Sequence, residues 1–415
     1  MSQSPALTTP IDPSPQARPT PHVPAEGKAR FAAIDGLRGI ACLMVLYYHA
    51  WVAFAKPEWP SVPLGGRHLS LSRLFARGYG GVDLFFVLSG FCLSYPILSK
   101  PQRAANWGRY ALARTRRIVP PYWAALFLFG ALSLLVLNTP AQQWFRGDVE
   151  WPGLRSFVID GMLFWKKILA GPFWTLTLEW RWYFVFPLCI LLWRRTNAWT
   201  VLLVSLPLSA LSLLVKYRWN LEHAFAWEGG VFRYLPLFGL GILASELAVS
   251  RGRNGTERFI VRNAGWGLLL AIAWLFLFPA GDGQMFTLGG TVQRIATFGP
   301  LAFFATLAAV RDLKIERVLA WGPLVWVGTF SYSLYLLHAP FVWAEGYWVT
   351  QHVHSHAAQL VCYVFAIPGS MVLAAFMFFL VFERPFLARK PPMRAADVSE
   401  GTAPTAAALP EAAAP

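Results

Sequence analysis

Long apolar segments constrain this chain more than any other feature of its sequence. About 20 consecutive apolar residues match the roughly 30 Å hydrocarbon core of a bilayer, and stretches near that length recur along most of the chain. We expect ten membrane spans, at residues 30–54, 81–98, 121–137, 173–193, 198–215, 231–249, 264–279, 295–310, 323–343 and 359–382. The sequence therefore predicts an all-α fold, a polytopic membrane helix bundle of about ten transmembrane helices.

The composition agrees with this fold class. Of the 415 residues, 56% are hydrophobic and only 14% are charged, which is outside the usual range of soluble proteins. Residues 1–29 and 388–415 are rich in small residues and proline, so we expect disordered tails on either side of a transmembrane domain at residues 30–387. The first tail lacks the apolar core of a signal peptide, and the first span is then an uncleaved helix.

The positive charge has a simple origin. The formal net charge is +15, but the Lys and Arg residues sit mostly in short connectors on one side of the predicted spans. Retention of positive loops inside the cell explains this bias and places both termini in the cytoplasm. We therefore predict no nucleic-acid partner.

The cysteines and clustered histidines do not form a recognisable metal-binding motif. The four cysteines lie in apolar segments without metal-ligand spacing, and the histidines of HVHSH lack carboxylate or cysteine companions, so we predict no metal site.

The first predicted span carries three ionisable residues, Asp35, Arg38 and His49. Such groups are costly in hydrocarbon, so they usually face the bundle interior and serve a function. Arg38 and His49 are eleven residues apart, which places them on nearly the same helix face and about 16 Å apart along the axis. One stripe therefore holds a permanent cation and, deeper in the membrane, an acid or base.

The fourth span brings a carboxylate to a similar depth. Running inward from the outer surface, it places Glu179 about 8 Å below that surface and Tyr183 one turn deeper on the same face. His49 reaches a comparable depth from the other side. We expect Glu179 to orient His49 as a general base, although Glu179 could instead pair with Arg181 as a structural contact.

The second and ninth spans hold further candidates. In GGVDLFFVLSGF, Asp83 and Ser89 are polar, but Ser89 has no nucleophile-elbow motif, so helix packing is the favoured interpretation for it. In FSYSLYLLHAP, Tyr332 and His338 lie in the ninth span, and His338 competes with His49 as the base. Because Ala-Pro follows it, we favour an interfacial role for His338.

Arginines gather between the second and third spans, in RYALARTRRIVPPYW. The segment places Arg114 and Arg117 at the cytoplasmic surface, beside Arg38. The positive-inside bias accounts for this cluster as well as a phosphate-binding role does, and both interpretations stay open.

At these motifs the chain resembles the integral-membrane acyltransferase 3 family, whose first helix carries an Arg and a His separated by ten residues. Arg38 and His49 match that pair, and the likeness continues through GGVDLFFVLSGF, the R-x-x-R before PPYW, FSYSLYLLHAP and FERPF. The family's W-S-L-x-x-E-x-x-F-Y pattern appears with Thr175 in place of the serine and Arg181 where an uncharged residue is common.

The resemblance implies transfer of an acyl group, with acetyl expected, from cytoplasmic acyl-CoA to a hydroxyl of a glycan, a lipid-linked sugar or a small molecule. It implies no permanently bound cofactor and a place in the bacterial inner membrane. Arg38, Arg114 and Arg117 would then bind the donor, while His49, Glu179 and Tyr183 carry the chemistry. Asp35, Asp83, Ser89, Tyr332 and His338 are the supporting candidates.

Two other mechanisms fit the same residues. A transporter or flippase could use His49 and Glu179 as a proton relay. The acyl group could also cross the membrane on a covalent His49 adduct. The acceptor, the oligomeric state and any partner protein are left open by the sequence.

Overall fold

The computed structural model of this chain describes residues 26–53, 61–64, 67–100, 106–145, 150–164, 171–219, 231–277 and 288–387. The expected tails at residues 1–29 and 388–415 lie outside these ranges, apart from residues 26–29. Those four residues form the start of the first helix, α1 (Glu26–Ala53).

The described residues are helical almost throughout, which confirms the predicted all-α, polytopic membrane bundle. Within them, seven helices are long and apolar enough to cross a membrane, and an eighth span is possible if the bent pair α8 and α9 counts as one. The shorter apolar helix α10 adds a further segment of 14 residues. The count of ten spans and the cytoplasmic placement of both termini stay predictions.

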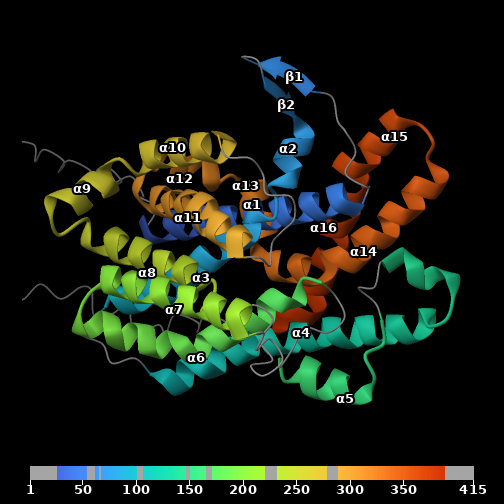
Figure 1. Ribbon diagram of the computed structural model, residues 1–415, viewed down its shortest axis with the longest axis horizontal. Helices are drawn as coiled ribbons and strands as arrows, with labels where there is room; N and C mark the ends of the chain where they lie inside the picture. Colours follow the sequence, from blue (N-terminus) through green and yellow to red (C-terminus); the bar gives the residue numbers. More distant parts are fainter. Residues whose placement is uncertain are drawn as a thin grey trace, which may run out of the picture. The chain divides into compact units, whose positions relative to one another are not determined.

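The chain divides into two compact units, each of which combines segments that are distant in sequence. Figure 1 labels the helices and strands that they contain. The first unit contains residues up to Leu43, Gly80–Tyr95 and Leu237–Thr329. It contains the first part of α1, most of α3 (Gly80–Leu98) and most of α8 (Leu235–Ser250). The helices that lie wholly in it are α9 (Gly255–Arg262), α10 (Ala264–Leu277), α11 (Leu288–Arg311), α12 (Leu313–Leu319) and α13 (Gly322–Thr329). Helices α10 and α11 lie side by side in it.

Glycines let the helices of the first unit approach closely. A Cβ atom on Gly90 of α3 would collide with the carbonyl oxygen of Phe238 on α8, and one on Gly241 of α8 would collide with the carbonyl oxygen of Val87. Side chains at these two positions would force the backbones apart. Small residues at a crossing are the usual means of close packing between membrane helices.

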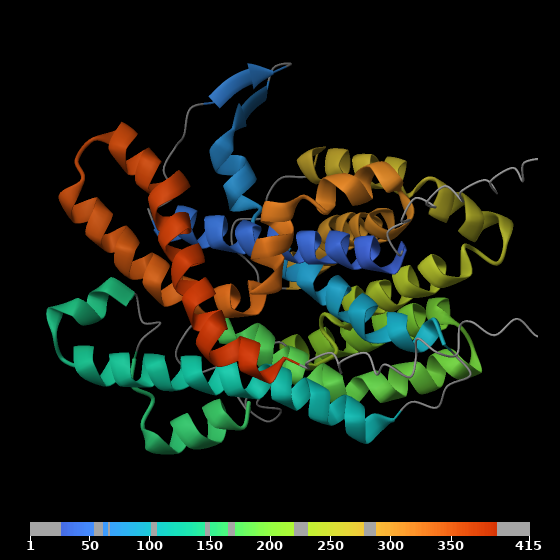
Figure 2. The ribbon, with the colours of Figure 1, turned by 180° about the vertical axis from the view of Figure 1, so that it is seen from behind.

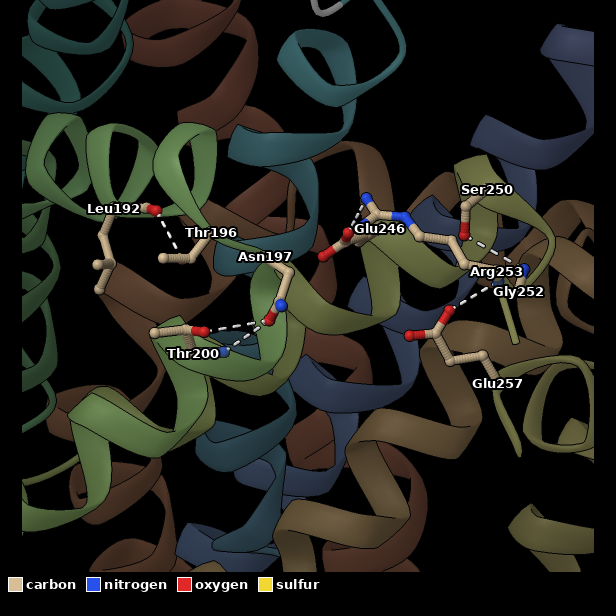
Figure 3. Close-up of polar contacts among 9 residues, drawn as sticks. All are labelled: Leu192, Thr196, Asn197, Thr200, Glu246, Ser250, Gly252, Arg253 and Glu257. Atoms are coloured by element: carbon tan, nitrogen blue, oxygen red, sulfur yellow. Dashed lines mark hydrogen bonds and ion pairs between the residues drawn. The ribbon is translucent and has the colours of Figure 1, made fainter. Parts of the chain in front are cut away.

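A sharp corner joins α8 to α9, whose axes differ by 96°. Gly252 takes a positive φ of 86° there, and its amide donates to the Ser250 hydroxyl (Figure 3). Arg253 forms an ion pair with Glu246, and its backbone amide donates to Glu257 Oε2 at 2.7 Å. These contacts fix the direction in which α9 leaves α8.

The second unit contains Met44–Tyr79, Pro96–Pro236 and the chain from Phe330 onward. Its larger helices are α4 (Trp107–Val136), α6 (Phe173–Arg195), α7 (Ala198–Trp219), α14 (Ser331–His352) and α16 (Ile367–Phe378). Its smaller elements are β1 (Ser61–Leu64), β2 (Arg67–Ser70), α2 (Leu71–Ala76), η1 (Pro140–Phe145), α5 (Leu154–Ser156), η2 (Phe157–Met162), α15 (His356–Val361), η3 (Cys362–Ala366), η4 (Phe379–Glu383) and η5 (Arg384–Phe386).

Within the second unit, β1 and β2 form a two-stranded antiparallel hairpin. Helices α14 and α16 lie side by side, as Figure 2 shows from behind. At the turn between α6 and α7, Asn197 Oδ1 accepts from the amide of Thr200 at 2.9 Å and caps α7 (Figure 3). Thr196 ends α6 by donating to the carbonyl of Leu192.

Two predicted spans differ from the structure in ways that matter for the site. The segment expected as one helix at residues 323–343 is broken at Phe330, which has φ −116° and separates α13 from α14. The third span was expected to begin at residue 121, but α4 begins at Trp107. Its first turns therefore contain the arginine cluster, so the prediction that this cluster lies in a connector is wrong.

Candidate active site

Two histidines from distant parts of the chain meet in the second unit. His49 comes from the last turns of α1 and His338 from the second turn of α14. His338 Nε2 lies 3.3 Å from His49 Nδ1, and the ring centroids are 4.7 Å apart in an edge-to-face arrangement. His338 is 1% exposed, whereas His49 is half-buried. His49 is therefore the member of the pair that a substrate can reach.

The surrounding carbonyl groups decide which nitrogens carry protons. His338 Nδ1 lies 2.8 Å from the carbonyl oxygen of Tyr335, so it must be the donor, which leaves His338 Nε2 as an acceptor. His49 Nδ1 lies 2.9 Å from the carbonyl oxygen of Val45 and faces His338 Nε2. It therefore carries a proton shared between these two acceptors. The second nitrogen of His49, Nε2, is then unprotonated and can act as a base.

Glu179 and Tyr183 form a second group, on α6. The Tyr183 hydroxyl donates to Glu179 Oε1 at 2.7 Å across one helical turn. The guanidinium of Arg114 lies 6.0 Å from the centre of the Tyr183 ring and 5.8 Å from that of Tyr110. Arg117 is also within electrostatic reach of Tyr183. The R-x-x-R arginines of α4 and the carboxylate of α6 therefore belong to one cluster.

Tyr332 connects this cluster to the helix that carries His338. Its hydroxyl donates to the carbonyl oxygen of Ile118, the residue after Arg117, at 3.0 Å. Tyr332 also lies within electrostatic reach of Glu179 and Tyr183. The first turn of α14 is thus fixed against the middle of α4.

The expected contact of Glu179 with His49 is not found: the ring next to His49 belongs to His338, and Glu179 pairs with Tyr183. Depth along a helix was estimated from residue counts, but the direction in which a side chain faces depends on packing between helices. The interfacial interpretation favoured for His338 does not match its burial and its contact with His49.

In the first unit, Arg38 and Asp35 lie on α1 with their nearest charged atoms 3.8 Å apart. The Arg38 side chain is 20% exposed. Asp83 lies on α3 and Arg294 on α11; their side chains are 0% and 2% exposed. They form a two-point ion pair, with Arg294 Nη2 2.9 Å from Asp83 Oδ2 and Nε 3.2 Å from Oδ1.

Asp83, one of the supporting candidates, is therefore held by Arg294 within the first unit. Ser89 lies half-buried on α3, directly before Gly90 at the crossing with α8. That position agrees with the packing role favoured for it.

One polar residue was overlooked in the sequence. Glu383, in FERPF, is 1% exposed and accepts from both the amide and the hydroxyl of Ser333, at 3.2 and 2.5 Å. Phe330, the residue directly before α14, supplies no side-chain cap, and Glu383 instead accepts from an amide in the first turn of that helix. The sequence signal was an acidic residue directly after the last apolar span.

Comparisons with known proteins agree with these features. A family model described as an acyltransferase domain matches residues 31–375. The peptidoglycan O-acetyltransferase OatA of Listeria monocytogenes is 23% identical over 334 residues, which cover 75% of this chain and 49% of OatA. A Rhizobium radiobacter protein named Protein 2 in picA locus is 34% identical over 156 residues, covering 36% of this chain and 69% of that protein.

The chain thus spans about half the length of the OatA that it matches. No solved structure matches it.

Proposed function

Because this chain belongs to the acyltransferase 3 family, we propose that it is a membrane O-acyltransferase that moves an acyl group from acyl-CoA to a hydroxyl group. The acyl group we expect is acetyl, in keeping with the name of the OatA relative. The acceptor is a glycan, a lipid-linked sugar or a small molecule. The chain is an integral, multi-pass membrane protein, and we propose the inner membrane of a bacterium as its location.

The observation that carries this proposal is the histidine pair. His49 Nε2 is free to take the proton of an acceptor hydroxyl, since Nδ1 is committed to Val45 and His338. The acceptor oxygen then attacks the thioester carbonyl carbon. The carbon–sulfur bond breaks, and the CoA thiolate leaves with the proton that His49 had taken. Both proton and acyl group are accounted for without a further reactant.

His338 acts through His49 in this scheme. When His49 is protonated, its Nδ1–H is a charged donor to His338 Nε2, and a hydrogen bond from a charged group is stronger than a neutral one. His338 is therefore a positioning residue that favours the protonated state of His49. Its burial keeps water from competing for that hydrogen bond.

We assign Arg114 and Arg117 to the phosphates of the donor. A guanidinium offers several donors in a planar fork and suits phosphate groups. Glu179 and Tyr183 lie in the same cluster, so we place them on the donor side of the site, where Glu179 holds the Tyr183 hydroxyl. Arg38 shares the helix of His49 and is proposed as a further contact of the donor.

The test is acyl transfer by the full chain, purified and reconstituted in vesicles with acetyl-CoA that carries a labelled acetyl group. Candidate acceptors are supplied, and the label is followed onto them. A positioned base contributes about 10²- to 10⁴-fold in rate, so we expect His49→Ala to lose transfer by that factor while the protein stays folded. Unchanged turnover in this variant would refute the role of His49.

The same experiment separates the other mechanisms. A proton-coupled transporter would show substrate flux without label on any acceptor. A covalent intermediate would leave label on the protein, bound at His49, when the acceptor is withheld.

A further inference from the structure

Aromatic residues gather at the start of α4, next to the R-x-x-R arginines. Trp107 and Tyr110 come from α4, and Tyr183 and Phe186 come from α6. The ring of Tyr110 lies 5.8 Å from Trp107, 5.5 Å from Phe186 and 6.4 Å from Tyr183, measured between centroids. We call these four residues the α4 aromatic group.

The hydroxyl group of Tyr110 is unsatisfied within the part of the chain that the structure describes. It is buried and has no hydrogen-bond partner there, although Tyr183 beside it donates to Glu179. A buried polar atom without a partner is costly and rare in native proteins. A ligand that brings a hydrogen-bonding edge to this position would remove that cost.

The rim of the group is accessible, because Trp107 is 36% exposed. The next residues toward the centre of α4 on the same face are Arg114 and Arg117, which are half-buried, whereas Arg109 and Arg116 are exposed on other faces. Along α4 the order is therefore aromatic rings, then two cations, then Ile118, whose carbonyl binds Tyr332.

This order corresponds to the chemistry of a nucleotide. A planar base stacks on aromatic rings and presents hydrogen-bonding edges, and its phosphates require fixed cations a short distance away. A lipid headgroup would use the arginines but has no base to place against the rings. The aromatic group therefore favours a nucleotide over a lipid phosphate.

We infer that the start of α4 binds the adenosine end of the acyl-CoA donor, with the base against Trp107 and an edge of the base hydrogen-bonded to the Tyr110 hydroxyl. This inference rests on the proposed function. It gives the donor a direction along α4: adenosine lies at Trp107, the phosphates lie at Arg114 and Arg117, and the pantetheine arm continues toward Ile118 and Tyr332.

The test compares two donors on the reconstituted full chain: acetyl-CoA, and acetyl-4′-phosphopantetheine, which keeps the thioester arm and one phosphate but lacks adenosine. Base stacking on an aromatic side chain is worth a factor of about 5 to 150. We expect Trp107→Ala to raise the KM for acetyl-CoA within that range and to leave the KM for the truncated donor unchanged. Tyr110→Phe should raise the KM for acetyl-CoA about 2- to 13-fold, the value of one hydrogen bond.

Trp123→Ala is the matched control. Trp123 lies on the same helix with 37% exposure, but its indole nitrogen donates to the carbonyl of Met162, away from the aromatic group. Its removal should change the KM for neither donor. Thermal unfolding of each variant checks that the fold is retained.

The outcomes are distinct. If Trp107→Ala raises the KM for both donors equally, Trp107 acts through the structure of α4 and the inference is overturned. It is also overturned if the wild-type protein uses both donors with equal KM, because adenosine then makes no contact, although the proposed function stands. If neither donor transfers its acetyl group, the proposed function fails and the inference fails with it.

Discussion

Replacement of His338 tests whether the buried histidine assists His49 or does the chemistry itself. In His338→Ala the imidazole that faces His49 Nδ1 is removed, while the carbonyl of Val45 still accepts from the same nitrogen. His49 therefore keeps its tautomer and remains a base, but it loses the acceptor that stabilises its protonated state. We expect kcat to fall and the KM for acetyl-CoA to stay constant.

The size of the effect follows from the charge on His49. The hydrogen bond to His338 is worth about 0.5–1.5 kcal/mol while His49 is neutral and about 1.5–3 kcal/mol once it is charged. Only the difference, about 1–1.5 kcal/mol, accelerates the reaction, which corresponds to about a 5- to 13-fold loss of kcat. That loss is well below the 10²- to 10⁴-fold effect expected for His49→Ala.

The assay is steady-state acyl transfer with purified, reconstituted protein, accompanied by thermal unfolding. His338→Gln places an amide oxygen near the position of Nε2 and should recover most of the lost rate. The double variant His49→Ala/His338→Ala should be no slower than His49→Ala alone, because the two residues act as a unit. If His338→Ala is as slow as His49→Ala while folded, His338 contacts the substrate and our assignment of roles is wrong.

Three further perturbations test other parts of the structure. Arg38→Lys keeps the charge but loses the guanidinium fork, so the KM for acetyl-CoA should rise; an unchanged KM would make Arg38 structural. Asp83→Asn removes the buried carboxylate charge that pairs with Arg294 and should cost about 3–5 kcal/mol of stability, seen as a lower unfolding temperature, whereas Asp83→Leu combined with Arg294→Met should recover much of it. Gly90→Val places a side chain against the carbonyl of Phe238 and should destabilise the fold by about 1–3 kcal/mol; an unfolding temperature equal to that of the wild type would contradict this close packing.

The positions of the helices could be predicted from the sequence because apolar length is set by the bilayer. The spans beginning near residues 81 and 173 match α3 and α6 to within a residue or two at each end. The breaks were harder to predict. The hydropathy of Phe330 does not distinguish it from its neighbours. The position of the break between α13 and α14 depends instead on how other residues pack around Phe330.

Cationic residues are the reason why the start of α4 was predicted too late in the chain. Arginines inside a helix near a membrane surface look like a loop when only hydropathy is considered, yet Arg114 and Arg117 are part of an unbroken helix from Trp107. Their long side chains can reach a polar cluster while the backbone stays helical. The contact of His49 with His338 was beyond prediction for a related reason, since it depends on how α1 and α14 are rotated about their axes.

The unbroken course of α1 has a consequence for how this helix can vary. Arg38 and His49 are eleven positions apart in one continuous helix, which corresponds to a rise of about 16 Å along its axis. Inserting or deleting one residue between them would turn one against the other by about 100°, whereas a change of seven residues would keep them within about 20° but alter the distance by about 10 Å. Substitutions within the helix therefore preserve the distance and angle between Arg38 and His49, whereas any insertion between them changes at least one of the two.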